Sequence, residues 1–233
     1  MSIMEQLKNG LIVSCQAEGD SPFNTTEGVS NFAETAKMGG AIAIRSQGVE
    51  KTAAIIKRVD LPVVGLVKSS FDDGYVRITG SFKDVEALVE IGTHIIAIDG
   101  TFREREGMSG PEFIKEVKQR YNCIVMADIA TVEEGEACEA AGADCLSTTL
   151  SGYTPNTKDK PKDGPDFEFL EQMVASSKVP VFAEGRVNTP ADAARMIELG
   201  AWAVVVGSAI TRPHLITEWY VEKIKEVTKT YIG

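Results

Sequence analysis

Histidine is nearly absent from this sequence of 233 residues, which contains only His94 and His214. Two imidazoles cannot build a multi-histidine metal centre, nor a mechanism that uses several histidines as acids and bases. We therefore expect no metal site. Any chemistry must come from Lys, Asp, Glu, Arg or Cys side chains.

Cysteines are few, and long hydrophobic runs are missing. The four cysteines, Cys15, Cys123, Cys138 and Cys145, form no CxxC pair and have no zinc-ligand spacing. No apolar run approaches the roughly 18 residues that span a bilayer, and no signal peptide is recognisable. These features predict reduced thiols in a cytoplasmic protein without a membrane partner. Cys15 has no nearby histidine to activate it, so we expect a packed thiol there.

Positive charge is also in short supply. The chain has 24 Lys and Arg against 34 Asp and Glu, which gives a net charge of -10. This balance argues against nucleic acid as a partner, because binding to phosphate backbones relies on excess positive charge. An anionic ligand would need a local positive site.

The sequence does contain a regular alternation of short β-branched apolar runs and longer stretches with helical spacing. Helical patterns occupy Phe82–Ile91, Val132–Ala141, Phe167–Val174 and Ala191–Leu199, and glycine follows several helices. The predicted strands are Leu11–Gln16, Ala41–Arg45, Pro62–Lys68, His94–Asp99, Cys123–Asp128, Cys145–Thr149, Pro180–Glu184 and Ala203–Gly207. Eight such units predict an α/β fold, a (β/α)8 TIM barrel that forms a single domain over residues 1–233. The rival, a doubly wound open sheet, lacks its usual GxGxxG turn here.

Polar residues close most of the predicted strands, at the end where barrel enzymes have their active sites. The opposite strand ends are largely uncharged. The residues at the carboxyl ends include Gln16, Arg45, Lys68, Asp99, Asp128 and Glu184. One polar residue at a strand end is ordinary, but a whole ring of them predicts a binding site.

Lys68 and Glu184 are the candidate acid and base. Lys68 follows an apolar strand that neighbours the strand of Arg45, and burial with a nearby cation favours a neutral amine. Glu184 closes a strand four positions away around the barrel, so it should face Lys68 across the mouth. Asp128 is placed to orient Lys68 or to bind a hydroxyl. The alternatives without a catalytic role are a solvated Lys68 at the start of a loop and a simple ion pair of Glu184 with Arg186 or Lys68.

Two glycine turns after the last two strands predict a phosphate site. Gly185–Arg186 and Gly207–Ser208 stand where barrels commonly bind phosphate through backbone N–H groups. Arg186 and Arg212 would add charge-assisted contacts. The alternative is that both glycines only permit tight turns.

Several segments resemble one known family in order along the chain. They include LIVSCQA from Leu11, AIR ending at Arg45, GLVK ending at Lys68, STTLSGYT from Ser147 and GSAITRP from Gly207. They are similar to the N-acetylmannosamine-6-phosphate 2-epimerases of sialic acid catabolism. Ser69 and Ser208 replace an arginine and a glycine that are frequent in that family.

The resemblance implies a (β/α)8 isomerase without a cofactor, acting on a phosphorylated amino sugar. It places the catalytic lysine on Lys68 and the catalytic glutamate on Glu184. It also places supporting substrate-binding residues on Gln16, Arg45 and Asp128, and phosphate-binding turns on Gly185–Arg186 and Gly207–Ser208. We add Tyr153, from the STTLSGYT segment, to the expected substrate-binding residues and Arg212 to the phosphate-binding ones.

Three other functions remain open from the residues alone. They are a Schiff-base aldolase that uses Lys68, another phosphate-binding barrel enzyme, and a non-catalytic phosphosugar-binding protein.

The C-terminal stretch Leu215–Ile232 has apolar residues at helical spacing. We expect it to pack on the barrel, with a possible homodimer contact.

Overall fold

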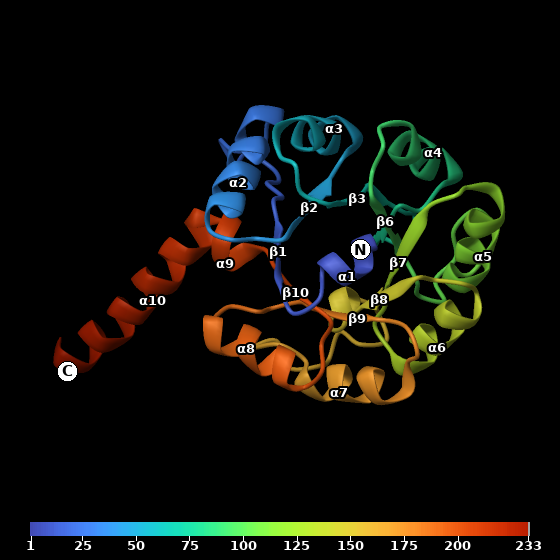
Figure 1. Ribbon diagram of the computed structural model, residues 1–233. Coiled ribbons are helices and arrows are strands. Elements are labelled where there is room, and N and C mark those ends of the chain that lie inside the picture. Colours follow the sequence, from blue (N-terminus) through green and yellow to red (C-terminus); the bar gives the residue numbers. More distant parts are fainter. Residues whose placement is uncertain (233) are drawn as a thin grey trace.

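The computed structural model describes residues 1–232, and its centre is a closed barrel of eight parallel strands (Figure 1). The strands follow one another around the barrel in the order β1-β10-β9-β8-β7-β6-β3-β2. They are β1 (Leu11–Ser14), β2 (Ala43–Gln47), β3 (Val63–Leu66), β6 (Ile95–Asp99), β7 (Ile124–Asp128), β8 (Cys145–Ser147), β9 (Val181–Glu184) and β10 (Val204–Val206). Each predicted strand is present, so the (β/α)8 prediction is confirmed.

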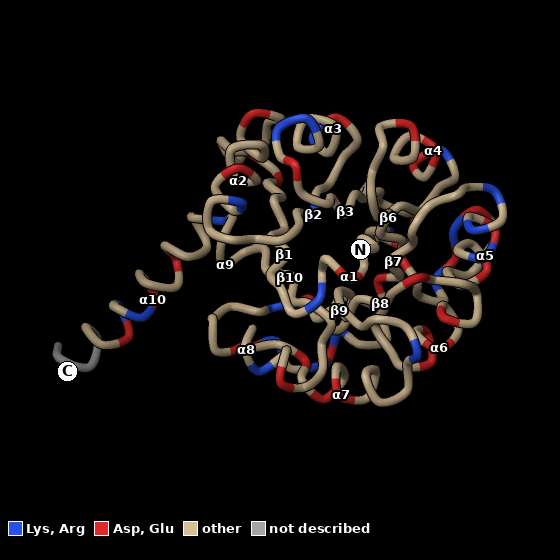
Figure 2. The backbone as a smooth tube through the Cα atoms, viewed as in Figure 1, with Lys and Arg blue, Asp and Glu red and all other residues tan. Residues whose placement is uncertain are grey.

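Helices surround the barrel between successive strands (Figure 1). The outer helices are α2 (Thr26–Met38), α3 (Val49–Arg58), α4 (Phe82–Glu90), α5 (Gly110–Arg120), α6 (Val132–Ala140), α7 (Phe167–Ser176) and α8 (Pro190–Glu198). Shorter elements are α1 (Ile3–Gln6), the 3-10 turn η1 (Thr148–Leu150) and α9 (Ser208–Thr211), and α10 (Pro213–Ile232) ends the chain. Lys, Arg, Asp and Glu lie mainly along the outer helices and loops (Figure 2).

Local sequence signals explain where the helices begin and end. Thr189 caps α8 by accepting a hydrogen bond from the Asp192 N–H at 3.1 Å, and Pro190 occupies the first turn. Asp166 caps α7 in the same way, accepting from the Phe169 N–H. At the other end, Gly200 follows α8 with a φ of 96°, a left-handed conformation that favours glycine.

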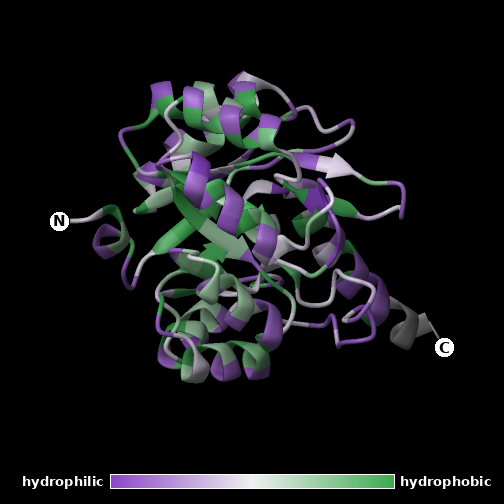
Figure 3. Cartoon of the chain, turned by 90° about the vertical axis from the view of Figure 1, so that its right-hand side faces the viewer, coloured by the Kyte–Doolittle hydropathy of each residue, from purple (hydrophilic) through white to green (hydrophobic). Residues whose placement is uncertain are grey.

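The hydrophobic core has an inner and an outer part. Inside the barrel, Ile12, Val64, Met126 and Phe182 are buried together, and Leu7, just after α1, joins them. A larger cluster fills the space between the strands and the helices from α4 to α8. Figure 3 shows the apolar strands enclosed by helices whose residues alternate between apolar and polar. The inner cluster therefore fills the barrel, and only its carboxyl end remains for a site.

Two expectations require correction. Lys68 does not close a barrel strand: β3 ends at Leu66, and Lys68 begins β4 (Lys68–Ser70), which pairs antiparallel with β5 (Val76–Ile78) in a separate hairpin. The run Pro62–Lys68 thus continues from the barrel into this hairpin.

The second correction concerns the terminal helix, of which only the beginning lies against its own barrel, where Leu215 lines the cavity at the strand ends. α10 projects away from the other helices (Figure 1), and Trp219, Tyr220 and Ile224 are exposed. Apolar spacing marked one face of this helix, but it could not indicate what covers that face. No helix within residues 1–232 is long and apolar enough to cross a membrane.

Candidate active site

A cavity of about 910 Å³ opens at the carboxyl ends of the strands. Residues at or after the carboxyl ends of β1, β2, β3, β8, β9 and β10 line it, and the β4–β5 hairpin contributes Tyr75, Val76 and Ile78. The predicted site residues that line it are Gln16, Arg45, Lys68, Tyr153, Glu184, Gly185, Arg186, Gly207, Ser208 and Arg212. Asp128 lies beneath the cavity floor and is fully buried. The barrel therefore brings the predicted residues to one place.

Arg45 forms the floor of the cavity with two carboxylates. Its Nη2 lies 2.5 Å from Asp128 Oδ2, and its Nη1 lies 3.3 Å from Glu184 Oε2. The Thr149 hydroxyl lies 2.9 Å from Asp128 Oδ1 and 3.0 Å from Glu184 Oε2. A buried guanidinium fixed on two sides in this way cannot swing freely. Asp128 thus holds Arg45 rather than Lys68, which corrects the expected contact.

Burial sets the protonation of both carboxyl groups. It raises the pKa of Glu184 above its usual range, although Arg45 opposes the shift. Burial likewise raises the pKa of Asp128 against the pull of Arg45. Glu184 also feels the charge of Lys68. A carboxyl group with a raised pKa can hold and release a proton closer to neutral pH.

Lys68 lies at the cavity wall with its side chain about one-third exposed. Its amine forms an ion pair with Glu18, whose other oxygen lies 3.2 Å from Arg212 Nη2. Burial raises the pKa of Glu18, but the hydrogen bond and charge of Lys68 and the charge of Arg212 outweigh it, so the pKa is lowered. Lys68 thus forms its ion pair with Glu18, whereas Arg45 pairs with Asp128 and Glu184.

The glycine turns lie where the sequence indicated, and Arg186 also forms hydrogen bonds with the loop after β8. Its Nε donates to the Gly164 carbonyl at 2.7 Å and its Nη1 to the Ser151 carbonyl at 2.8 Å, and it lies against the Tyr153 ring. Gly185 has a φ of 112°, where a side chain would strain the backbone. Arg186 therefore braces the loop over the cavity from two directions.

Two site residues were missed from the sequence. Glu18 sits in an irregular loop, and nothing in its spacing connects it with Lys68 or Arg212. Thr149 follows β8 in η1, and its place at a strand end was the one signal available.

Cys15 is 1 % exposed, and burial raises its pKa to about 12, so the prediction of a packed thiol is confirmed. In residues 1–232 no cluster of three or more His, Cys, Asp or Glu side chains is arranged to hold a metal.

Comparison with known proteins adds a family to this geometry. Residues 29–226 match a family described as "putative N-acetylmannosamine-6-phosphate epimerase". A relative of that name from Caldanaerobacter subterraneus is 45 % identical over 228 residues, which cover 97 % of this chain and 95 % of the relative. Another from Clostridioides difficile is 44 % identical, with 96 % and 99 % covered.

The chain belongs to the N-acetylmannosamine-6-phosphate epimerase family. It is therefore an enzyme of the isomerase class. A solved structure of the family's Clostridium perfringens 2-epimerase superposes with a TM-score of 0.88 at 40 % identity and covers 95 % of this chain and 96 % of its own. A thiamine phosphate pyrophosphorylase from Pyrococcus furiosus, 19 % identical with a TM-score of 0.61, shares the fold alone.

Proposed function

We propose that this chain interconverts N-acetylmannosamine 6-phosphate and N-acetylglucosamine 6-phosphate. The two sugars differ only in configuration at C2, so the reaction must break and remake the C2–H bond. The observation that supports this most is the pairing of Lys68 and Glu184 across one cavity. Glu184 ends β9, and Lys68 begins the hairpin that follows β3, the strand four positions from β9 in either direction around the barrel. A small sugar between them would meet a base on one side and an acid on the other.

Each of these groups has a role in the proposed proton transfer. The sugar ring first opens, and the C1 aldehyde makes the neighbouring C2 proton acidic. Lys68, once its ion pair with Glu18 is released and its amine is unprotonated, takes that proton. The electron pair moves to the C1 oxygen as an enolate, because C2 carries the acetamido nitrogen rather than a hydroxyl. Arg45 and the newly formed ammonium of Lys68 face the developing negative charge. Glu184, with its raised pKa, gives a proton to the ring oxygen while the O1 hydroxyl proton passes back to its carboxylate, and it then protonates C2. Exchange with solvent returns Lys68 and Glu184 to their starting protonation states.

The phosphate would bind on the side of the cavity formed by the last two βα turns. Gly185, Gly207 and Ser208 present backbone there, and Arg212 adds a positive charge. Arg186 contributes by holding the loop that carries Tyr153 against the same turn. Gln16, held by its hydrogen bond to Ser14 at 2.9 Å, would contact the sugar.

Replacement of the two central residues tests the proposal. Lys68→Met and Glu184→Gln should each abolish most epimerase activity, as general acid–base groups contribute about 10²- to 10⁴-fold. Full activity in either variant would show that the site assignment is wrong. Borohydride should fail to trap substrate on the protein, whereas a Schiff-base aldolase would be trapped through Lys68.

The cytoplasmic location suggested by the cysteines stays a prediction.

We also propose that the protein is a homodimer joined through α10. Trp219, Ile224 and Val227 lie exposed on this helix, and an apolar groove of about 410 Å³ runs beside α8 and β10. The groove lies where a helix following β10 would normally cover the barrel, so α10 of a second copy suits it. Ile224→Glu should produce a monomer in light scattering after size exclusion. Lys225→Glu, on the opposite side of α10, should leave the dimer intact, and a monomeric parent protein would refute the proposal.

A further inference from the structure

The position of Lys68 depends on the hairpin that carries it. Lys68 is the first residue of β4, and it pairs with Ile78 of β5. The base of the hairpin is fixed by Val67 and Thr79, since the Val67 N–H donates to the Thr79 hydroxyl at 3.1 Å and the Thr79 N–H donates to the Val67 carbonyl at 2.6 Å. Beyond this base the hairpin stands over the cavity as one of its walls, so a second attachment decides its tilt.

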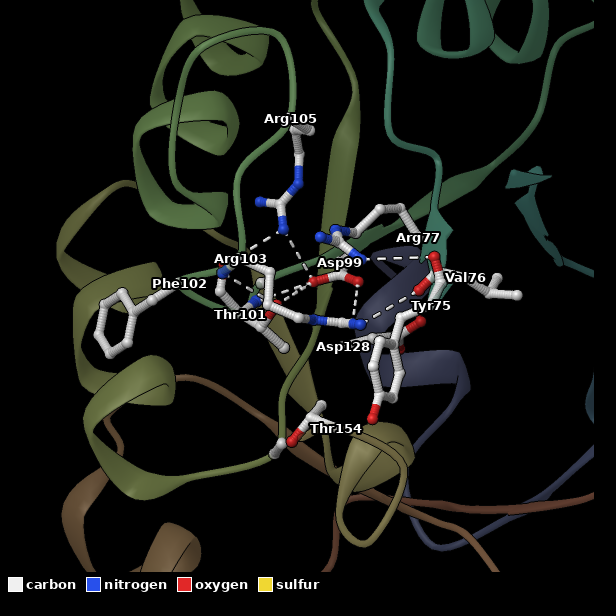
Figure 4. A network of polar contacts seen from close by, with 12 residues as sticks. Tyr75, Val76, Arg77, Asp99, Thr101, Phe102, Arg103, Arg105, Asp128 and Thr154 are labelled. Atoms are coloured by element: carbon white, nitrogen blue, oxygen red, sulfur yellow. Dashed lines mark hydrogen bonds and ion pairs between the residues drawn. The ribbon is translucent and has the colours of Figure 1, made fainter. Parts of the chain in front are cut away.

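Arg103 provides that second attachment. Its Nη1 donates to the carbonyl of Val76, which is paired with Ser70 in the hairpin, at 3.3 Å. Its Nη2 donates to Asp99 Oδ2 at 2.6 Å, and its Nε donates to the Thr101 hydroxyl at 2.9 Å. One planar guanidinium thus joins the end of barrel strand β6 to the hairpin (Figure 4).

Asp99 is a rigid anchor for Arg103. It is fully buried at the end of β6, and its Oδ1 accepts hydrogen bonds from the Thr101 N–H at 3.0 Å, the Thr101 hydroxyl at 2.6 Å and Arg105 Nη2 at 2.9 Å. Arg105 is itself fully buried and also reaches the Thr101 carbonyl at 3.2 Å. Burial lowers the pKa of Arg103 and of Arg105, and the charge of Asp99 opposes both shifts. A buried charge network held at this many points has little freedom to move.

We propose that Arg103 is a positioning residue that sets the placement of the Lys68 amine over the substrate's C2 atom. The inference rests on the proposed role of Lys68 as the base. Asp99 holds one side of the Arg103 guanidinium in place, and the hydrogen bond from Arg103 to the Val76 carbonyl then holds the hairpin in place relative to β6. Arg105 shares the same carboxylate but contacts the loop after β6, so it stabilises the anchor without reaching the hairpin.

Arg103→Met tests the inference because it keeps an unbranched apolar stem in place of the arginine stem and removes all three side-chain hydrogen bonds. We expect kcat to fall by about 10- to 100-fold, the cost of a misplaced reacting group. KM should change little, because the proposed phosphate contacts come from the turns after β9 and β10. The isotope effect on kcat with substrate deuterated at C2 should rise, since proton transfer becomes slower relative to the other steps.

Arg103→Lys serves if the methionine variant does not fold. Its single amine can stay beside Asp99, but it cannot donate to Thr101 and Val76 with the geometry of a guanidinium. We expect kcat to fall in Arg103→Lys as well, but by less than in Arg103→Met, and KM should again change little.

Arg105→Lys is the matched control on the same carboxylate. It should lower the free energy of unfolding while kcat stays within about twofold of the parent value. An unchanged kcat in the folded Arg103 variant, or an equal fall in kcat in Arg105→Lys, would overturn the inference. Full activity in Lys68→Met would instead overturn the proposed function, so the two failures are distinguishable.

Discussion

Removal of Arg45 should destabilise the protein strongly, because it leaves two buried carboxyl groups without their cation. Arg45 is 1 % exposed and contacts both Asp128 and Glu184. Breaking a buried ion pair by deleting one partner costs about 3–5 kcal/mol. For a domain of this size each kcal/mol lowers Tm by about 2–4 °C, so Arg45→Met should lower Tm by about 6–20 °C.

The loss of stability in Arg45→Met should depend on pH. Burial already raises the pKa of Asp128 and Glu184 above the ordinary values of 3.8 and 4.5, and loss of the cation raises both further. Between those ordinary values and the raised ones, the folded variant binds more protons than the unfolded chain. Its free energy of unfolding therefore decreases as pH rises through that window. The variant should be closer to the parent at about pH 5 than at about pH 7.

Urea denaturation followed by circular dichroism at the two pH values measures both effects. Arg58→Met is the control, since Arg58 forms an exposed ion pair with Glu34, and its removal should leave no measurable loss. The double variant Arg45→Met/Asp128→Asn should recover part of the stability by removing one uncompensated carboxylate. A loss below about 1 kcal/mol for Arg45→Met, or equal losses at both pH values, would show that Arg45 does not neutralise Asp128 and Glu184 in the folded protein.

Two further predictions concern carboxylates at the cavity. Glu18 forms ion pairs with both Lys68 and Arg212 and so competes with substrate for them, and Glu18→Gln should lower KM for the phosphosugar by about two- to fivefold. Asp20→Asn in the same loop is the control and should leave KM unchanged. An unchanged or higher KM in Glu18→Gln would contradict this competition. Burial raises the pKa of Glu184, so kcat should fall as pH rises through that pKa and its proton is lost, and a pH profile with no such limb would contradict its role as an acid.

The eight barrel strands were predictable because buried parallel strands read as short apolar runs in any context. Runs such as Ile124–Asp128 need no knowledge of their neighbours to be recognised. The ring of polar residues at the strand ends was predictable for the same reason, since the topology alone brings the carboxyl ends together. Arg45 and Glu184 meet on the cavity floor in this way.

The contacts made by loops and the terminal helix were not predictable from local pattern. Lys68 continues an apolar run without a break, so nothing marks the change from β3 to the hairpin until Gly74 allows the turn with a φ of 79°. Arg103 lies in an irregular segment, and its contact with Val76 bridges 27 positions of sequence. The apolar face of α10 was visible, but whether its own barrel covers it depends on the direction of the chain after Arg212.

The central claim is that Lys68 removes the C2 proton of an open-chain phosphosugar, and isotope exchange tests it most directly. The reaction is run in heavy water from N-acetylmannosamine 6-phosphate, and the product is analysed by proton NMR and mass spectrometry. Deuterium is expected at C2 of the N-acetylglucosamine 6-phosphate formed, and Lys68→Met should form labelled product at least about 100-fold more slowly than the parent. Product that forms at the parent rate without deuterium at C2, or labelled product that Lys68→Met forms at the parent rate, would contradict this role of Lys68.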